Sequence, residues 1–588
     1  MVRSERAIIA GIAIVLGICC VLPQVLGYLT RGDRYNYFSL PFSTETHVDE
    51  SVFYAPQAAY AMQTRRIPLE IDIYEYRHVP TIRYFLPALI EGQVDRWCAD
   101  TGWGWLTTRF LFSCGAFLLA YSLAKKLSRT KTVACLAAVV FCTVGFGPQT
   151  FLNTYQGSFR VPMFFSRMDA PLISVSFLLA ALVTLIGALE KRSFVRAVIA
   201  GLAGGSLFYT YYYYQVAYCA ALFMMIGVYA VRRDAGKARI TIAAGGIAAI
   251  VALPWCHQFM ATVAAQRGLI ARWSSWTYHP STLQVSSAVV YTILLVIVYA
   301  AQRKSVDTGT GEDRQDEYAA YVPLYCLLGA ALGIEYCITR FTTVVASPDH
   351  FTSRLTHAFT LLVFVCGTSG WILARASRYK RYCVLAIIIL LMAAGVKQGV
   401  VWCSTRNDFM ENTLLRGAQQ LVRERTIDAD VIGLRDAYVN SIFPARLWRF
   451  RFYTVFRLSS IGSRENLMRY VFLQKMFDVP WNVVEDRLLA RQDMVRLPVS
   501  SITVALWLSF ERALSAPEAG ELKIFYGAAD RRFLTDKKLD YVVCLEKREA
   551  DALVSGANKM GIRAELDARR GDAYLFRIKK EPVEEHIS

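Results

Sequence analysis

The sequence predicts a polytopic α-helical membrane protein with about eleven transmembrane helices and a small C-terminal α/β domain outside the cytoplasm. Hydrophobic residues make up 55% of the 588 residues and charged residues only 19%, whereas a soluble domain usually has about 25% charged residues. Apolar runs long enough to cross a bilayer recur along the first two thirds of the chain. Basic residues collect in alternate loops between these runs, as the positive-inside rule requires.

The first predicted element is an apolar run over residues 7–28, preceded by Arg3 and Arg6. This run is longer than the apolar core of a cleaved signal peptide, so we expect a retained signal anchor with its N-terminus in the cytoplasm. The further predicted spans are residues 106–124, 132–148, 172–189, 195–210, 212–231, 240–255, 286–301, 319–338, 358–374 and 383–403.

Loop charges set the expected orientation of these spans. The basic clusters fall within residues 125–131, 191–196, 232–239, 303–304 and 375–381, and we assign these loops to the cytoplasm. An odd number of spans then places the first loop (residues 29–105) and the C-terminal domain together on the outer face. The net charge of +18, from 65 basic and 47 acidic residues, is explained by these loops, so we expect no nucleic-acid partner.

The chain after the last span has a different composition, with frequent charges of both signs. We expect a transmembrane domain over residues 1–404, a soluble α/β domain over 405–580 and a disordered tail over 581–588. Within the soluble domain, the sequence predicts strands at residues 429–434 and 539–545, a helix at 547–560, and a hairpin formed by 562–566 and 573–578. No known catalytic or nucleotide-binding motif marks this domain.

The candidate catalytic residues are Asp49 and Glu50, which follow the first span. Adjacent residues on a helix point about 100° apart, so the two carboxylates do not converge as a dyad would. One carboxylate at the membrane surface can act as a general base that takes the proton from an attacking hydroxyl group. The alternative is that the pair only caps the helix that follows it.

The first loop resembles that of the GT-C glycosyltransferases, membrane enzymes that use polyprenyl-phosphate sugars and include protein O-mannosyltransferases and aminoarabinose transferases. The matching segments are Asp49-Glu50, Tyr54, residues 58–62, 65–68 and 84–92, and the run 107–112 that opens the second span. One departure from the family is Pro56, which is tolerated only in a first helical turn. We therefore expect the helix to begin near residue 52, leaving Asp49 and Glu50 on a loop.

The resemblance implies an inverting glycosyltransferase of the inner (plasma) membrane, whose C-terminal domain is periplasmic or extracellular. It would transfer a sugar from a polyprenyl-phosphate donor to a lipid, protein or glycan acceptor. Asp49 would be the general base, and Glu50 would support it or contact the acceptor. Tyr54 and His78 are the expected substrate-binding residues of the first loop.

A departing phosphate gains negative charge and needs a cation beside it. The family carries an Arg–aromatic cluster before a late span, which here corresponds to Arg354 with His350. Arg160 and Arg167 are second candidates for the same role. The alternatives are an interfacial arginine that reaches toward the headgroups and solvated loop residues.

Two other patterns have less definite meanings. The aromatic run 208–214 either stacks on sugar rings or belongs to an interfacial belt of aromatic residues. His47 and His78 lie in the same loop as the carboxylates, but no ligand spacing indicates a metal. We therefore predict no cofactor, with a divalent metal as the alternative.

Two other functions are compatible with the sequence. A transporter or flippase for lipid-linked sugars would carry ionisable residues within its spans, and Glu335 is the one acidic residue clearly inside a predicted span. A non-catalytic envelope assembly protein would use its external domain to bind a partner, and Asp49 would be dispensable.

Overall fold

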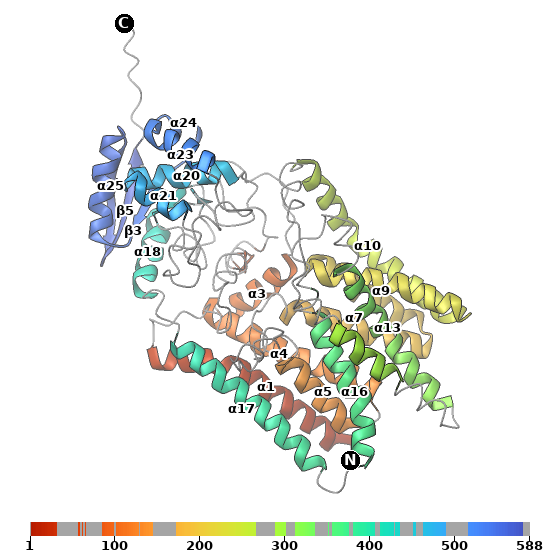
Figure 1. Ribbon diagram of the computed structural model, residues 1–588. Helices are drawn as coiled ribbons and strands as arrows, with labels where there is room; N and C mark the ends of the chain where they lie inside the picture. Colours follow the sequence, from red (N-terminus) through yellow and green to blue (C-terminus); the bar gives the residue numbers. More distant parts are fainter. Residues whose placement is uncertain are drawn as a thin grey trace.

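The structure is a computed structural model. It describes residues 2–31, 57–58, 61–62, 65, 85–98, 101–128, 130–144, 172–265, 289–300, 312–335, 351, 355–375, 380–405, 412–427, 430–435, 451–453, 463–489 and 516–579. Its helices form one large bundle, and a smaller domain containing a β-sheet follows it in the chain (Figure 1).

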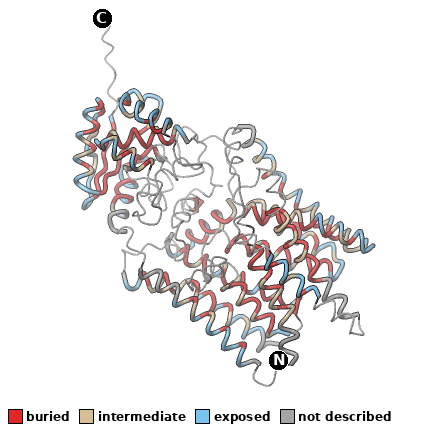
Figure 2. Tube along the Cα trace, viewed as in Figure 1, coloured by how far each residue is buried: buried red, intermediate tan, exposed pale blue. Residues whose placement is uncertain are grey.

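Five of the described helices are long and apolar enough to cross a membrane. They are α1 (Val2–Arg31), α4 (Thr101–Leu127), α7 (Ser174–Lys191), α9 (Tyr212–Val231) and α10 (Ala235–Ala265). Shorter apolar segments occur in the helix Val289–Ala300 and in α5 (Lys131–Thr143), α8 (Phe194–Ser206), α13 (Glu312–Gly333), α16 (His357–Arg375) and α17 (Lys380–Thr405). Buried side chains line the inner faces of these helices (Figure 2). The chain is therefore a helical membrane protein.

Helices α1 and α4 pack in antiparallel directions. The thiol of Cys114 donates a hydrogen bond to the carbonyl of Ala13 at 3.2 Å. One and a half turns away, Nε of Arg109 donates to the carbonyl of Cys20 at 3.1 Å. The N-terminus of α1 therefore lies beside the C-terminal end of α4.

Close packing of α8 against α10 depends on glycine. A Cβ atom at Gly201 would lie 2.7 Å from the carbonyl oxygen of Ala244, and one at Gly205 would lie 2.5 Å from Cβ of Val251. Small residues four positions apart allow two helix backbones to approach closely inside a membrane.

Short turns join α4 to α5, α7 to α8 and α9 to α10 at one end of the bundle. Lys126 of the first turn pairs with Glu190 of the second at 2.5 Å, and Arg192 of the second pairs with Asp234 of the third at 3.6 Å. These turns carry three of the basic clusters in the sequence, and we call this the basic end. The antiparallel α1–α4 pair places Arg31, where α1 ends, at the opposite end, which we call the first-loop end.

The C-terminal domain contains a five-stranded sheet of order β2-β1-β3-β5-β4. Its strands are β1 (Val431–Leu434), β2 (Arg451–Phe452), β3 (Tyr541–Cys544), β4 (Arg563–Arg570) and β5 (Ala573–Lys579). Strands β2, β1 and β3 are parallel, while β5 is antiparallel to both β3 and β4. The predicted strands and the predicted hairpin correspond to β1, β3, β4 and β5.

Five helices share one apolar core with this sheet. They are α20 (Ser463–Met476), α21 (Trp481–Leu489), α23 (Ala516–Ala528), α24 (Phe533–Asp536) and α25 (Lys547–Lys559). A further helix, α18 (Asn412–Arg425), contacts β4 through an ion pair of Glu424 with Arg570 at 3.0 Å. The sheet domain lies beyond the ends of α1 and α17, on the side of the first-loop end (Figure 1).

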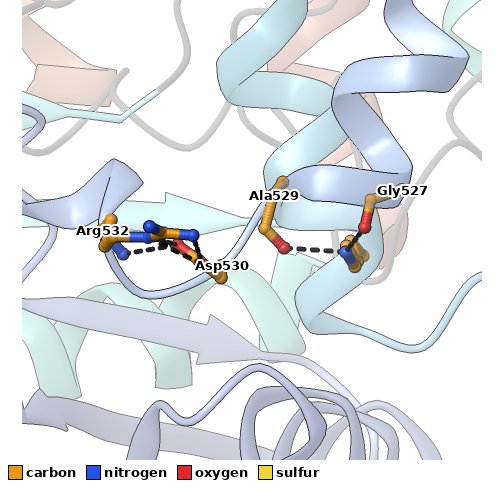
Figure 3. Close-up of polar contacts among 5 residues, drawn as sticks. Gly527, Ala529, Asp530 and Arg532 are labelled. Atoms are coloured by element: carbon orange, nitrogen blue, oxygen red, sulfur yellow. Dashed lines mark hydrogen bonds and ion pairs between the residues drawn. The ribbon is translucent and has the colours of Figure 1, made fainter.

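A lysine fixes the end of α23 against α20. Nζ of Lys475 donates to the carbonyls of Gly527 and Ala529 at 2.8 and 2.7 Å, which satisfies groups that a helix end leaves unbonded. Burial holds the pKa of Lys475 below its usual value. Beside these carbonyls, Arg532 and Asp530 form an exposed ion pair (Figure 3).

Candidate functional site

Parts of the first loop pack directly on the helical bundle. Helix α3 (Phe85–Cys98) precedes α4 and lies against the segment formed by residues 57–62. At Gly92 a Cβ atom would lie 2.5 Å from the carbonyl oxygen of Ala58 and 2.8 Å from the backbone nitrogen of Met62. The absence of a side chain at Gly92 therefore allows the two parts of the loop to touch through their backbones.

Two carboxylates lie on the buried face of α3. Glu91 and Asp95 are each 1% exposed, and their spacing of four residues puts them on one side of the helix. Asp95 lies directly over Gly104 at the start of α4, where any larger residue would collide with it. Burial of carboxylates is costly without polar partners, and both residues interact with other residues of the chain.

A polar group lies deeper in the bundle, between α1 and α4. Arg109 is 1% exposed and lies with its guanidinium 5.3 Å from the centre of the Trp105 ring. Its acceptor, the carbonyl of Cys20, stands one turn before Gln24, which is fully buried. Pro23 has no N–H to bond the carbonyl of Cys19, so Arg109 bonds to α1 one residue from the carbonyl that loses its helical donor.

The aromatic run lies at the first-loop end and is largely buried. Tyr214 is 0% exposed, and Tyr211 and Tyr213 are also buried. The ring of Tyr209, in the short helix η4 (Leu207–Tyr209), lies 5.2 Å from the ring of Phe85 in α3. An interfacial belt facing lipid does not describe the buried rings, because neighbouring helices cover them.

The same run touches the segment that precedes α16. The rings of Tyr213 and Phe351 lie 5.1 Å apart in an edge-to-face arrangement. Phe351 follows His350 and stands three residues before Arg354. The structure thus brings together the first loop, the aromatic run and the chain next to the predicted phosphate-binding residues.

The predicted site residues themselves lie outside the described residues. They are Asp49, Glu50, Tyr54, His78, Arg160, Arg167, His350 and Arg354. Their roles stay predictions, and the described neighbours are residues 57–62 and α3 for the first loop and Phe351 for the segment before α16. Glu335, two residues past the end of α13, is 0% exposed and interacts with another residue of the chain.

Sequence reasoning missed the buried charges on α3 and α4. The signal was present: Glu91 and Asp95 fall on the same helical face as Pro87, Ala88 and Val94, all of them buried. A charged residue on an apolar face predicts a buried polar contact. Arg109 was noted only as part of the run that opens the second span, and its burial between two spans was not predicted.

Within the part of the chain that the structure describes, no three His, Cys, Asp or Glu side chains lie close enough to hold a metal ion. The carboxylates and histidines of the first loop that would form such a site are not among those residues. The prediction of no metal is therefore neither supported nor opposed.

No protein-family model matches the sequence, and no curated protein matches it. Solved structures do resemble the fold. One is the archaeal oligosaccharyltransferase AglB from Archaeoglobus fulgidus in complex with an inhibitory peptide and a dolichol-phosphate, at 12% identity and a TM-score of 0.42. That match covers 97% of this chain and 88% of that chain.

Another is ArnT from Cupriavidus metallidurans bound to undecaprenyl phosphate, at 11% identity and a TM-score of 0.41. It covers 95% of this chain and 97% of that chain. Both TM-scores lie below 0.5 and both identities below 25%, so neither similarity carries an argument about the family or the catalytic residues of this chain.

Proposed function

We propose that this protein is a membrane glycosyltransferase that moves a sugar from a polyprenyl-phosphate carrier to an acceptor at the first-loop end of the bundle. The proposal depends on the sequence of the first loop and on the way that loop packs. Its sequence resembles the GT-C pattern from Asp49 onward. Its helix α3 packs on the bundle at Gly104 and Tyr209, and Gly92 of α3 contacts the loop segment at Ala58.

The described contacts support a site at this end. Phe85 of α3 packs on Tyr209, and Tyr213 packs on Phe351. These contacts hold α3 of the first loop, the aromatic run and Phe351 in one region. A transferase needs such proximity, because the base, the sugar and the departing phosphate are all within a few ångströms of the reacting carbon.

The proposed chemistry is an inverting displacement. The carboxylate of Asp49 takes the proton from the acceptor hydroxyl as its oxygen attacks the anomeric carbon. The bond from that carbon to the phosphate oxygen breaks, and the polyprenyl phosphate leaves with the bonding electrons. Arg354, with His350, stabilises the charge on this phosphate, with Arg160 and Arg167 as the second candidates.

The buried residues of α3 have a supporting part in this proposal. Asp95 packs against Gly104 at the start of α4, and Gly92 contacts the segment after Asp49 at Ala58 and Met62. These two contacts set the distance between that segment and α4. Neither carboxylate needs to touch the sugar.

The experiment is a transfer assay with the purified full-length protein and a panel of polyprenyl-phosphate sugars, offered with lipid, peptide and glycan acceptors. We expect release of polyprenyl phosphate and a glycosylated product from one donor of the panel. If no donor yields product and the reconstituted protein moves lipid-linked sugars across vesicles, the protein is a transporter and the proposal fails.

A further inference from the structure

The turns that join α7 to α8 and α9 to α10 form a strongly basic surface. Over the three turns of the basic end, the described residues include ten basic and only two acidic side chains. The basic ones are Lys125, Lys126, Lys131, Lys191, Arg192, Arg196, Arg232, Arg233, Lys237 and Arg239, and the acidic ones are Glu190 and Asp234. The described part of this surface therefore carries eight more basic than acidic side chains.

These two turns lie where apolar spans end. The span in α7 runs to Lys191 and the span in α9 runs to Val231, so Arg192 and Arg233 stand just past the hydrocarbon region. In a bilayer that position is the layer of lipid headgroups. The neighbouring Phe194, Val195 and Val231 are 63%, 69% and 85% exposed, which is expected of side chains that face acyl chains.

Asp234 is the acidic side chain between these two turns, and it contacts two of the basic side chains. Asp234 receives a contact from Arg192 at 3.6 Å and from Lys237 at 3.5 Å, and it also accepts the backbone N–H of Lys237 at the start of α10. The Arg192 side chain stays 66% exposed. Arg233 is exposed and forms no ion pair with any residue that the structure describes.

The backbone at these arginines is unusual. Arg192 has a φ of 45° and Arg233 a φ of 57°, a left-handed conformation that favours glycine and is unfavourable for residues with a side chain. Glycine or asparagine normally occupies this position after a helix. Both turns carry arginine at this position instead, although the backbone conformation there favours glycine.

We propose that the turns Lys191–Ser193 and Arg232–Asp234 form a binding site for the phosphate headgroups of anionic phospholipids. The guanidinium groups of Arg192 and Arg233 donate paired hydrogen bonds to phosphate oxygens. The acyl chains lie along the exposed apolar faces of α8 and α10, which include Ile199 and Ile242. This site is at the opposite end of the bundle from the proposed transferase site and does not depend on that function.

The left-handed turns provide a test in which folding is not at risk. In the variant R192G/R233G, glycine accepts the same backbone conformation without strain. The two cations are lost together with the exposed contact of Arg192 with Asp234. The matched control is K523Q/R548Q, which removes two exposed cations from the C-terminal domain. Both double variants change the net charge equally.

The measurement is the thermal midpoint of the purified full-length protein in neutral detergent, titrated with short-chain phosphatidylglycerol or with phosphatidylcholine of the same chains. We expect a rise with phosphatidylglycerol alone, and an apparent affinity about 30-fold weaker in R192G/R233G, since each cation near an anionic surface contributes ~1 kcal/mol. The control variant keeps the wild-type affinity.

Three outcomes overturn the proposal. The first is an R192G/R233G variant that binds phosphatidylglycerol as tightly as wild type, or a wild type with no preference for it. The second is an equal loss in K523Q/R548Q, which would reduce the effect to net charge. The third is a midpoint rise of the same size with inorganic phosphate, which would make this a site for soluble anions.

Discussion

The contact between α3 and the segment after Asp49 leads to a specific prediction for Gly92→Ala. An ideal Cβ at this position lies 2.5 Å from the carbonyl oxygen of Ala58 and 2.8 Å from the backbone nitrogen of Met62, where ordinary contacts begin at 3.4 Å. Backbone atoms cannot rotate away as a side chain can. The two segments must therefore separate by about 1 Å, and a displacement of that size near reacting groups reduces rate about 100-fold.

Stability changes less than the rate in this variant. Forcing one methyl group into a packed contact costs about 1–3 kcal/mol, partly offset because alanine favours helix over glycine by about 1 kcal/mol. The control is Gly115→Ala in α4, where a Cβ atom meets nothing within 4 Å. We expect this control to match or exceed wild type in thermal midpoint and to keep its transfer rate.

The assay measures sugar transfer at saturating donor together with the thermal midpoint of each purified variant. A Gly92→Ala protein with the transfer rate and midpoint of Gly115→Ala would refute the reasoning. It would mean that the close packing of the first loop on α3 does not set the position of the catalytic segment.

Three further predictions concern stability, each measured as the thermal unfolding of the full-length protein. Arg109→Leu should cost about 2 kcal/mol because the carbonyl of Cys20 loses a charged donor beside a proline, and a stability equal to wild type would contradict this role. Arg469 is 0% exposed and bonded to Glu465, so Arg469→Leu should lower the free energy of unfolding by about 3 kcal/mol. The matched variant Arg532→Leu, at an exposed arginine, should leave the thermal midpoint unchanged. Equal effects of the two variants would contradict this prediction. The backbone N–H of Lys237, followed by nearby cations, holds the pKa of Asp234 below its usual value, so its charge stabilises the fold above the ordinary carboxyl pKa and this contribution is lost as pH falls through the lower folded value. Asp234→Asn should therefore be less stable than wild type at pH 7, and the difference should shrink as the pH falls below the ordinary carboxyl pKa. A difference that stays constant on acidification would contradict the assignment.

The C-terminal strands were accessible from sequence because short, fully buried runs have a clear apolar signature. Residues 431–434 and 541–544 are uniformly buried, and the hairpin turns at Gly571, which has a φ of 59°. Strand β2 was not predicted, because two residues, Arg451 and Phe452, carry no periodicity. Its pairing with β1 depends on tertiary contact alone.

The helical bundle shows a different limit of sequence analysis. Five of the eleven predicted spans correspond to described helices that are long and apolar enough to cross a membrane. Helix α10 extends beyond the predicted residues 240–255, from Ala235 to Ala265. Which faces of these helices are buried depends on their neighbours. For that reason the burial of Tyr213 and Tyr214 was not predicted, and the pairing of α1 with Arg109 was visible only once the helices were placed side by side.

The candidate site likewise has one part that the sequence predicts and another that only the packing of the helices reveals. The sequence predicts Asp49 and its partners through a family pattern, and those residues lie outside the described part of the structure. The supporting contacts, Gly92 on Ala58 and Asp95 on Gly104, have no family pattern behind them. They are found only from the packing of α3.

The central claim is that a carboxylate of the first loop acts as the base in sugar transfer at the first-loop end. The most direct measurement compares the transfer rate of Asp49→Asn with that of wild type, with the thermal midpoint and donor binding measured on the same samples. Loss of at least about 100-fold in rate, with the midpoint and donor affinity unchanged, is the result that general base catalysis predicts. A wild-type rate in Asp49→Asn would contradict the claim and remove this residue from the chemistry.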